Sequence, residues 1–427
     1  MRSLKYMRTV GLSERLRVLR TGFTRTFWVA NTLELFERFA FYGSKAVLAV
    51  YLSRAVGLTV ESGNDLVGLY GLLVFGLPVF AGVVVDRFGF KRSLLACFAI
   101  FSVGYTLIGL AGLPAGQPFV DAIGKKGFVV LALVVTAIGG SLIKPCIVGT
   151  VARTTTEETK GLGYSIYYTL VNFGGFFGPI LGSEVRLRLG IASVLVMSAS
   201  ISAALVFGTL AFYREPAGPR EGRTFGKVFA DFVLVICNVR FMLFLLIFSG
   251  FWLMFWHIFD ALPFYVTDVL KIDRFELLST VDAFGIMFLT VPVTWLMKKV
   301  KPIRAMAGGF AVASASWLII AFSQSWQGVV AAMLLFAVGE AMQAPRFYEY
   351  VADLAPEGQT GTYMGFAFLP VALGAFGAGH LSGVLVARYV RSGNPGTMWV
   401  ILSAIGFGAT FAMLLYDRFV APRKAAA

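Results

Sequence analysis

The sequence predicts an all-α protein that crosses a membrane many times, and three observations support this fold class. Of the 427 residues, 58% are hydrophobic and only 14% are charged, whereas soluble globular chains carry about 25% charged residues. The apolar residues form long stretches that match the roughly 20 residues a helix needs to span a bilayer. The basic residues are divided unevenly between alternate loops, as in polytopic membrane proteins. This composition argues against a soluble enzyme, a disordered chain or a disulfide scaffold.

Reading along the chain gives twelve predicted spans, each close to the length that crosses the hydrocarbon core. In order, they are 27–53, 66–85, 92–112, 128–151, 162–186, 191–213, 240–268, 275–297, 303–322, 326–352, 361–386 and 397–419. Several spans contain a proline, which membrane helices tolerate and which can mark a bend. These prolines are Pro78, Pro145, Pro179, Pro292, Pro345 and Pro370.

The distribution of Lys and Arg predicts the orientation. Most of the 37 basic residues lie in the two terminal segments and in the loops on the same side as the termini. Because cytoplasmic loops collect positive charge, we expect both termini in the cytoplasm and the chain in a bacterial-type inner or plasma membrane. The net charge of +14 is then a topology signal, so nucleic acid is not an expected partner. Membrane lipids are expected partners, and a monomer is the expected state.

A linker at 214–239 divides the chain into two groups of six spans. We predict a basic cytoplasmic arm at 1–26, an N-terminal bundle at 27–213, a C-terminal bundle at 240–420 and a cytoplasmic tail at 421–427. The arm either lies on the anionic inner leaflet as an amphipathic segment or is a solvated topology signal. Two pseudo-symmetric six-helix bundles around a midplane site are the layout of the major facilitator fold.

The loop between the second and third spans supports this layout. Residues 82–92 resemble the superfamily's loop motif, Gly-x-x-x-Asp-Arg-x-Gly-x-Lys/Arg-Lys/Arg. The matching residues are Gly82, Asp86, Arg87, Gly89, Lys91 and Arg92. We expect Gly82 to let helices approach one another. We expect Asp86 to cap a helix end and pair with basic residues, so that the loop latches one face of the bundle.

Ionisable residues inside the spans are the main functional candidates, because an unpaired charge in a membrane is costly. The first span carries Glu34, Glu37, Arg38 and Lys45 within about three helical turns, and Tyr42 shares their stripe. Lipid cannot lie in that direction, so we expect these side chains to line an internal cavity or to meet other helices. A purely structural ion-pair lattice is the alternative.

Other spans add charges that need partners. Lys144 in the fourth span needs a carboxylate, and Glu34 and Glu37 are the nearest plausible supply. His257 and Asp260 in the seventh span lie three residues apart, on one helix face. A proton relay between them is one interpretation, and a bond from His257 to a neighbouring helix is the other.

Two later spans contribute further charges. Asp282 in the eighth span is a candidate for a proton relay, and Glu340 lies in the middle of the tenth. Arg346 and Glu349 are three residues apart, and a simple pair between them and a functional role are both open interpretations. With two histidines in the whole chain, a metal site is not expected. No nucleophile–base motif indicates an enzyme, and no cofactor other than the proton is expected.

Several of these residues fall in motifs that resemble the proton-dependent oligopeptide transporter family. Residues 34–43 read Glu-Leu-Phe-Glu-Arg-Phe-Ala-Phe-Tyr-Gly, which is similar to that family's Glu-x-x-Glu-Arg-Phe-x-Tyr-Tyr-Gly signature. Gly140-x-x-x-Lys144-Pro145 resembles its fourth-helix lysine motif, and 164–176 resembles its fifth-helix pattern. The stretch 340–345 resembles its Glu-x-x-x-Ser/Ala-Pro motif.

The resemblance implies roles for the matching residues of the N-terminal half. Glu34, Glu37, Arg38 and Lys144 would couple proton movement to substrate binding. Arg38 and Lys144 would also hold the carboxylate of a peptide.

The resemblance also implies roles across the two halves. Glu340 would hold the amino group of a peptide, and Tyr42 and Asn172 would line the pocket. Lys45 would pair across the bundles with an acid of the seventh span, for which Asp260 is the available candidate.

The expected function is proton-coupled import of di- or tripeptides, or of a related zwitterionic solute, by alternating access. Phe41 replaces the first tyrosine of the signature, and the seventh span departs from the family pattern, so substrate identity stays open. Efflux of drugs or other organic solutes by proton antiport is one alternative. A nutrient sensor that binds without transporting is another.

Overall fold

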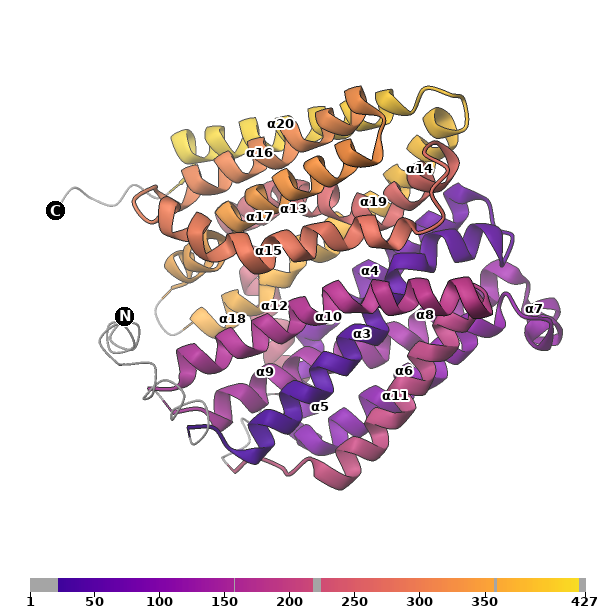
Figure 1. Cartoon of the computed structure of the whole chain (residues 1–427). Coiled ribbons are helices and arrows are strands. Elements are labelled where there is room, and N and C mark those ends of the chain that lie inside the picture. The colour runs from indigo at the N-terminus through magenta and orange to yellow at the C-terminus, as the bar shows by residue number, and fades with distance from the viewer. Residues whose placement is uncertain (1–21, 157, 218–223, 357–358, 422–427) are drawn as a thin grey trace.

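The computed structural model describes residues 22–156, 158–217, 224–356 and 359–421. Every regular element in these ranges is a helix. Most of the predicted basic arm and C-terminal tail lies outside the described residues. The first long helix begins and the last one ends at the same end of the molecule, which we call the terminal end (Figure 1). We call the opposite end the far end.

The N-terminal half is a bundle of long helices around α3 (Figure 1). Its helices are α3 (Arg25–Arg54), α4 (Val60–Gly76), α5 (Pro78–Phe88), α6 (Phe90–Leu110), α7 (Gln117–Ile123), α8 (Lys125–Ser141), α9 (Ile143–Thr154), α10 (Lys160–Leu189) and α11 (Ala192–Phe212). The helix α3 begins after Thr24, whose side-chain oxygen accepts a hydrogen bond from the Phe27 amide at 3.2 Å. It packs against α10 and α11 along its length.

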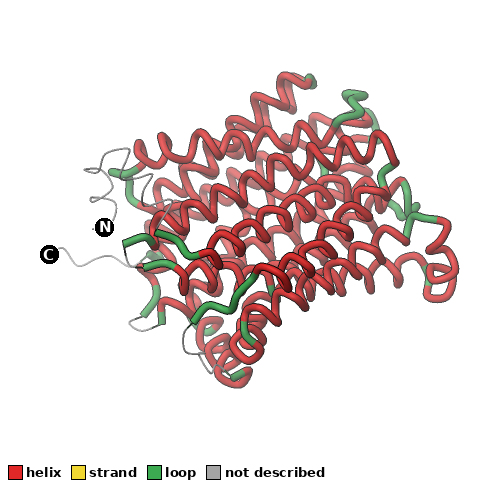
Figure 2. Tube along the Cα trace, turned by 60° about the horizontal axis from the view of Figure 1, so that its bottom comes forward, coloured by secondary structure: helices red, strands yellow, loops and turns green. Residues whose placement is uncertain are grey.

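The C-terminal half follows a helix in the linker, α12 (Phe225–Ile236). Its helices are α13 (Val239–Asp260), α14 (Leu262–Asp268), α15 (Phe275–Met297), α16 (Pro302–Ser323), α17 (Trp326–Leu354), α18 (Thr360–Gly365), α19 (Leu369–Leu385) and α20 (Pro395–Phe419). Here α16 packs against α17 and α20, and α13 against α19. The long helices run side by side along the molecule (Figure 2).

The helices match the predicted membrane class. Among the described residues, nine helices are long and apolar enough to cross a membrane, or ten if α4 and α5 form one span bent by 46°. The helices α3 and α10 are equally long, at 30 residues each, but more polar. The structure is therefore compatible with twelve spans. Pro78 begins α5 at the bend, whereas Pro179, Pro292 and Pro345 lie inside helices that continue through them.

The two bundles meet through two main helix pairs, α4 with α19 and α10 with α15. Glycines make the first contact close: a Cβ atom built on Gly379 would lie 2.6 Å from the Gly68 nitrogen. Within the N-terminal bundle, a Cβ atom on Gly178 of α10 would lie 2.9 Å from the Phe39 oxygen of α3. These close approaches hold α3 against α10 and bring the charged stripe of α3 near the side chains of α9 and α10.

Candidate functional site

The charged stripe of α3 is buried and internally paired. Arg38 Nε lies 2.5 Å from Glu37 Oε2 and 3.5 Å from Glu34 Oε1. Glu34, Glu37 and Arg38 are 0%, 1% and 5% exposed, so these charges are removed from solvent and lipid. The sequence predicts Glu34 and Arg38 on one stripe with Glu37 beside it, and the structure brings the three together.

Lys144 completes this cluster from a second helix. The helix is interrupted at Leu142, between α8 and α9. Lys144 lies in the first turn of α9. Its Nζ donates to Glu34 Oε1 at 3.1 Å and to the hydroxyl of Tyr167, from α10, at 2.7 Å. Glu34 therefore lies between two cations. We call Glu34, Glu37, Arg38 and Lys144 the N-bundle charge cluster, in which two carboxylates balance two cations.

Tyr167 is a member of the site that sequence reasoning missed. It lies in the stretch that resembles the fifth-helix pattern, but one of several aromatic residues there could not be singled out. Its ring also lies 5.2 Å from Lys144 Nζ, so the ammonium group contacts both its hydroxyl and its face.

Lys45 and Asp260 form an ion pair between the two bundles. Lys45 Nζ lies 2.7 Å from Asp260 Oδ1, at the C-terminal end of α13, and the two residues are 5% and 1% exposed. The ammonium group also lies 5.1 Å from the centre of the Trp256 ring. Asn64 of α4 donates to the backbone oxygen of Asp260 at 3.3 Å. The partner that the resemblance implied for Lys45 is the one that the structure places beside it.

Glu340 and Asp282 supply acids from the C-terminal bundle. Glu340 lies on α17 and Asp282 on α15, and they are 9% and 6% exposed. Within the described part of the chain, Glu340 Oε2 and Asp282 Oδ1 are buried without a hydrogen-bond partner, and neither residue forms an ion pair. The two carboxyl groups are near enough to interact electrostatically. Unlike the acids of α3, they have no cation to balance them.

Aromatic side chains surround the space between these charges. Tyr42 stacks near Arg38, whose guanidinium carbon lies 5.9 Å from its ring, and faces Phe259 of the other bundle at 6.3 Å. Tyr168 of α10 and Tyr348 of α17 expose 45% and 41% of their surface, and both lie near enough to Glu340 to interact with it electrostatically.

Asn172 makes a hydrogen bond within its own helix. Its side-chain nitrogen donates to the Tyr168 backbone oxygen at 2.9 Å, one turn earlier in α10. The amide is half-buried, and its expected role in lining the pocket stays a prediction.

The proposed relay between His257 and Asp260 is not formed. His257 is fully buried, and its Nδ1 lies 2.7 Å from the Leu253 oxygen in its own helix. Its Nε2 has no hydrogen-bond partner among the described residues. A spacing of three residues places two side chains on one face, but here the ring turns back along α13, while Asp260 faces Lys45. The expected bond from His257 to a neighbouring helix is not formed either.

The loop motif is built partly as expected. Gly89 alone joins α5 to α6 and has a φ of 85°, which favours glycine. The first amides of α6, of Phe90 and Lys91, donate to Glu215 Oε1 and Oε2 at 2.8 and 2.7 Å. The acid that caps α6 is therefore Glu215 of the linker, and the role expected of Asp86 stays a prediction.

The role expected for Gly82 in this motif is wrong for this conformation. A Cβ atom at Gly82 would meet no atom within 4 Å, so no described helix approaches it. Arg87 and Arg92 are exposed beside it at the terminal end.

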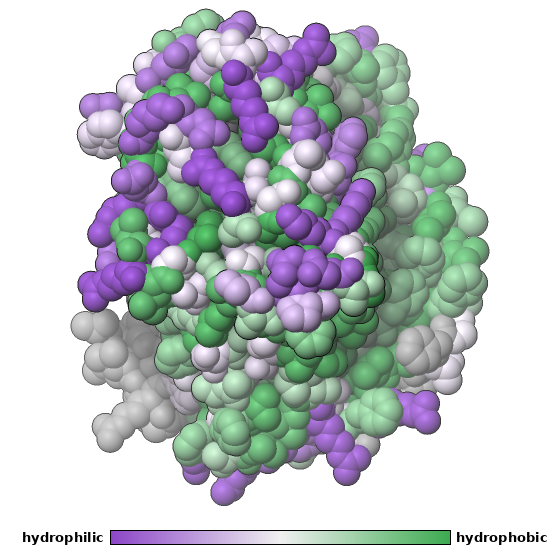
Figure 3. Space-filling view, turned by 90° about the vertical axis from the view of Figure 1, so that its right-hand side faces the viewer, coloured by the Kyte–Doolittle hydropathy of each residue, from purple (hydrophilic) through white to green (hydrophobic). Residues whose placement is uncertain are grey.

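Four further polar contacts join the bundles at the far end, and sequence reasoning missed them. Arg54 Nη2 lies 2.5 Å from Asp268 Oδ1, and His380 Nδ1 lies 2.9 Å from Asp65 Oδ1. The helices α10 and α15 are joined by Arg186 with Glu276 and by Glu184 with Arg274. Hydrophilic residues gather on this end of the molecule (Figure 3). These pairs and Lys45–Asp260 join the two bundles at the far end.

Comparison with known proteins agrees with this architecture. The model of the Major Facilitator Superfamily matches residues 32–379. The chain is 24% identical over 366 residues to the multidrug resistance protein MdtH of Klebsiella pneumoniae (strain 342), covering 84% of this chain and 85% of that protein. It is 24% identical over 356 residues to MdtH of Escherichia coli (strain K12 / DH10B), covering 81% and 83%.

Solved structures of transporters share the fold. A POT family transporter in complex with a thioalcohol-conjugated peptide has a TM-score of 0.76 at 17% identity, covering 93% of this chain and 97% of that chain. A POT family transporter in complex with 5-aminolevulinic acid has a TM-score of 0.75 at 16% identity, with the same coverage. At this identity, the similarity shows the fold.

Proposed function

The chain belongs to the Major Facilitator Superfamily, and from this premise we propose that it is a proton-coupled symporter that imports di- or tripeptides or a related zwitterionic solute. The observation that carries the proposal is the division of charge between the bundles. The N-terminal bundle holds two cations, Arg38 and Lys144, against two acids. In the C-terminal bundle, Glu340 has no ion-pair partner among the described residues. A zwitterion needs a cationic site at one end and an anionic site at the other, and the two bundles supply them separately.

The substrate's carboxylate is assigned to Lys144 and Arg38. Both are charge-assisted donors, which form the strong class of hydrogen bonds with carboxylates. Lys144 is the more accessible of the two, with 19% of its side chain exposed. The amino group is assigned to Glu340, because a buried carboxylate without a partner gains most from an arriving cation. Tyr42, Tyr168 and Asn172 border the space between these sites.

The proton is assigned to the carboxylates of the N-bundle charge cluster. When Glu34 or Glu37 takes a proton, its attraction for Lys144 or Arg38 falls, and that cation is freed to bind the substrate carboxylate. When the proton leaves, the ion pair forms again. The carboxylate of the protein then competes with the substrate carboxylate for the cation, and the substrate is released. Substrate and proton therefore bind together and leave together, which is the requirement for symport. The cycle needs no cofactor other than the proton.

The direction of access is assigned from the far-end contacts. Lys45–Asp260 and the pairs around it join the bundles at the far end, and we therefore assign the open side of the site to the terminal end. We place the terminal end in the cytoplasm, because the basic loops lie on that side. The inter-bundle pair would break when the far end opens to receive substrate, as rocking of one bundle against the other requires.

Proteoliposomes test the proposal directly. An imposed inward proton gradient should drive labelled dipeptide above its external concentration, and a protonophore should abolish the accumulation. Equal uptake with and without the gradient, across a broad panel of dipeptides, would contradict proton coupling.

Efflux by proton antiport is the second candidate. The observation that favours it is the sequence similarity to the MdtH proteins, which are named multidrug resistance proteins. The same vesicles distinguish the two candidates. Antiport predicts that an organic dye leaves the vesicles as protons enter them. A sensor that does not transport predicts saturable peptide binding without flux of either kind.

A further inference from the structure

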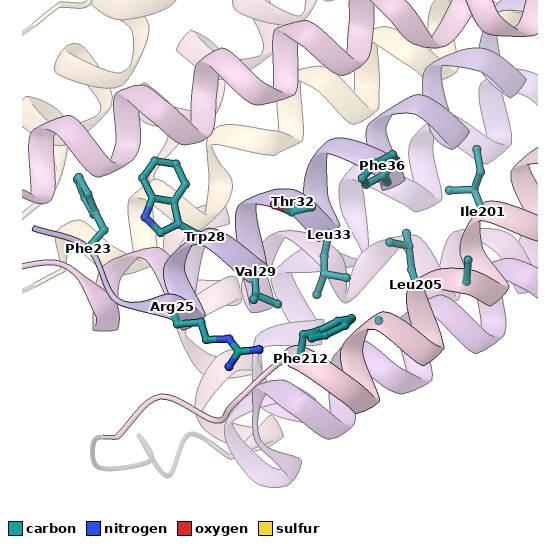
Figure 4. Close-up of a pocket in the computed structure, with 12 residues that line it drawn as sticks. Phe23, Arg25, Trp28, Val29, Thr32, Leu33, Phe36, Ile201, Leu205 and Phe212 are labelled. Atoms are coloured by element: carbon teal, nitrogen blue, oxygen red, sulfur yellow. The ribbon is translucent and has the colours of Figure 1, made fainter. Parts of the chain in front are cut away.

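The outer face of the N-terminal bundle carries an apolar groove that the transport cycle does not use. It lies between α3 and α11 and has a volume of about 830 Å³, in the range of roughly 300–1,000 Å³ of pockets that take small ligands. Trp28, Leu33 and Phe36 of α3 and Leu205 and Phe212 of α11 line it, and in Figure 4 Leu33 points toward α11. These residues lie on the side of α3 that faces away from the N-bundle charge cluster.

A single charged residue stands at one end of the groove. Arg25 is the first residue of α3 and lines the groove at the terminal end. In Figure 4 its guanidinium group extends toward Phe212. Among the residues that the structure describes, no carboxylate pairs with it. The groove therefore combines one uncompensated cation with a long apolar wall.

The length of the groove matches one leaflet of a bilayer. From Arg25 to Phe36 the helix advances by about 16 Å, which is about half of the 30 Å hydrocarbon core. Trp28 lies one turn from Arg25 and is 39% exposed, and tryptophan is enriched where the hydrocarbon meets the headgroups. The cation is thus at headgroup level, and the apolar wall runs from there toward the middle of the membrane.

We propose that this groove binds one anionic phospholipid, with the phosphate on Arg25 and an acyl chain along α3 and α11. The charge of Arg25 complements the phosphate, and the apolar wall complements the chain. The basic segments of the protein lie beside the leaflet at the terminal end. Anionic lipids are attracted to such segments. A lipid in this position packs directly against the back of the helix that carries Glu34 and Glu37.

Native mass spectrometry of the full chain tests the proposal, with phosphatidylglycerol and phosphatidylcholine of identical acyl chains added to the detergent-purified protein. The wild type should bind one phosphatidylglycerol about fivefold more tightly than phosphatidylcholine, the factor expected of one surface cation. Arg25→Gln should remove this preference, and Arg25→Lys should keep most of it. Lys299→Gln, which removes an exposed charge at the same end but outside the groove, should leave the preference unchanged.

A second variant tests the apolar wall. A Cβ atom on Gly208 of α11 would make only ordinary contact with Leu33, at 3.5 Å, so Gly208→Leu should fold and fill the groove. It should weaken the binding of both lipids at this site. Soluble glycerol 3-phosphate should not compete, because it lacks the chain.

Three results would overturn the proposal. They are equal binding of the two lipids by the wild type, the same loss of preference in Lys299→Gln as in Arg25→Gln, and competition by glycerol 3-phosphate as strong as that by the lipid.

Discussion

Lys45 Nζ lies 2.7 Å from Asp260 Oδ1, and this buried ion pair joins α3 of one bundle to the end of α13 of the other. The two residues are 215 positions apart in the chain. Because each charge is removed from solvent, neither is stable without the other. The pair therefore holds the far end closed and also provides a contact that must break in the transport cycle.

The first prediction concerns this pair. Lys45→Ala leaves Asp260 as a buried, unpaired charge, and we expect a loss of about 3–5 kcal/mol in the free energy of unfolding. Denaturant unfolding in detergent measures it. Lys45→Ala combined with Asp260→Ala should recover part of the loss. Arg54→Ala is the matched control, since Arg54 and Asp268 form an exposed inter-bundle pair that should contribute less than about 1 kcal/mol. Equal losses for Lys45→Ala and Arg54→Ala would contradict the importance given to burial.

The second prediction concerns proton coupling through Glu37. Glu37→Gln keeps the size of the side chain but cannot exchange a proton, so concentrative uptake should be abolished while substrate counterflow partly survives. Glu349→Gln is the control, because Glu349 pairs with Arg346 at 2.6 Å and the proposed cycle assigns it no step. Concentrative uptake by Glu37→Gln equal to that of the wild type would remove Glu37 from the mechanism.

The third prediction concerns recognition of the amino group. Glu340→Ala should weaken the binding of dipeptides by about 10- to 100-fold, the range for loss of a hydrogen bond to a charged group. Analogues that lack the amino group should lose little. Isothermal titration calorimetry on both ligand sets gives the comparison. If both sets lose affinity by the same factor, Glu340 does not contact the amino group.

The fourth prediction concerns closure of the far end. Gly379→Val places side-chain atoms where Gly68 and Asn64 already lie, so α4 and α19 should no longer close together. Transport should be lost, and a cysteine pair placed across α4 and α19 should cross-link more slowly. Gly408→Val is the control, because a Cβ atom there meets nothing within 4 Å. Wild-type transport by Gly379→Val would show that this close approach is not required.

Much of the fold could be predicted from the sequence. Bilayer thickness sets the length of an apolar span, and the positive charge of the loops sets which side of the membrane each loop faces. The N-bundle charge cluster was also predictable. Glu34, Glu37 and Arg38 share one helix, where spacing alone sets their neighbours, and Lys144 had few acids within reach.

The errors have a common physical origin. Helical spacing shows which face a residue occupies but not where its side chain turns, so His257 could be placed near Asp260 although its ring bonds to Leu253. The role of Gly82 depends on whether another helix comes near, which its own segment does not encode. The far-end pairs, such as Arg54 with Asp268, join segments that are distant in the chain and meet only when the bundles pack.

Proton movement driven by substrate tests the central claim most directly. Proteoliposomes containing a trapped pH-sensitive dye are given an inward gradient of dipeptide, with equal pH on both sides and the membrane potential clamped. The account predicts that the interior becomes more acidic as dipeptide enters, and that Glu37→Gln loses this response. Dipeptide entry without a pH change, or with a rise in internal pH, would contradict proton-coupled symport.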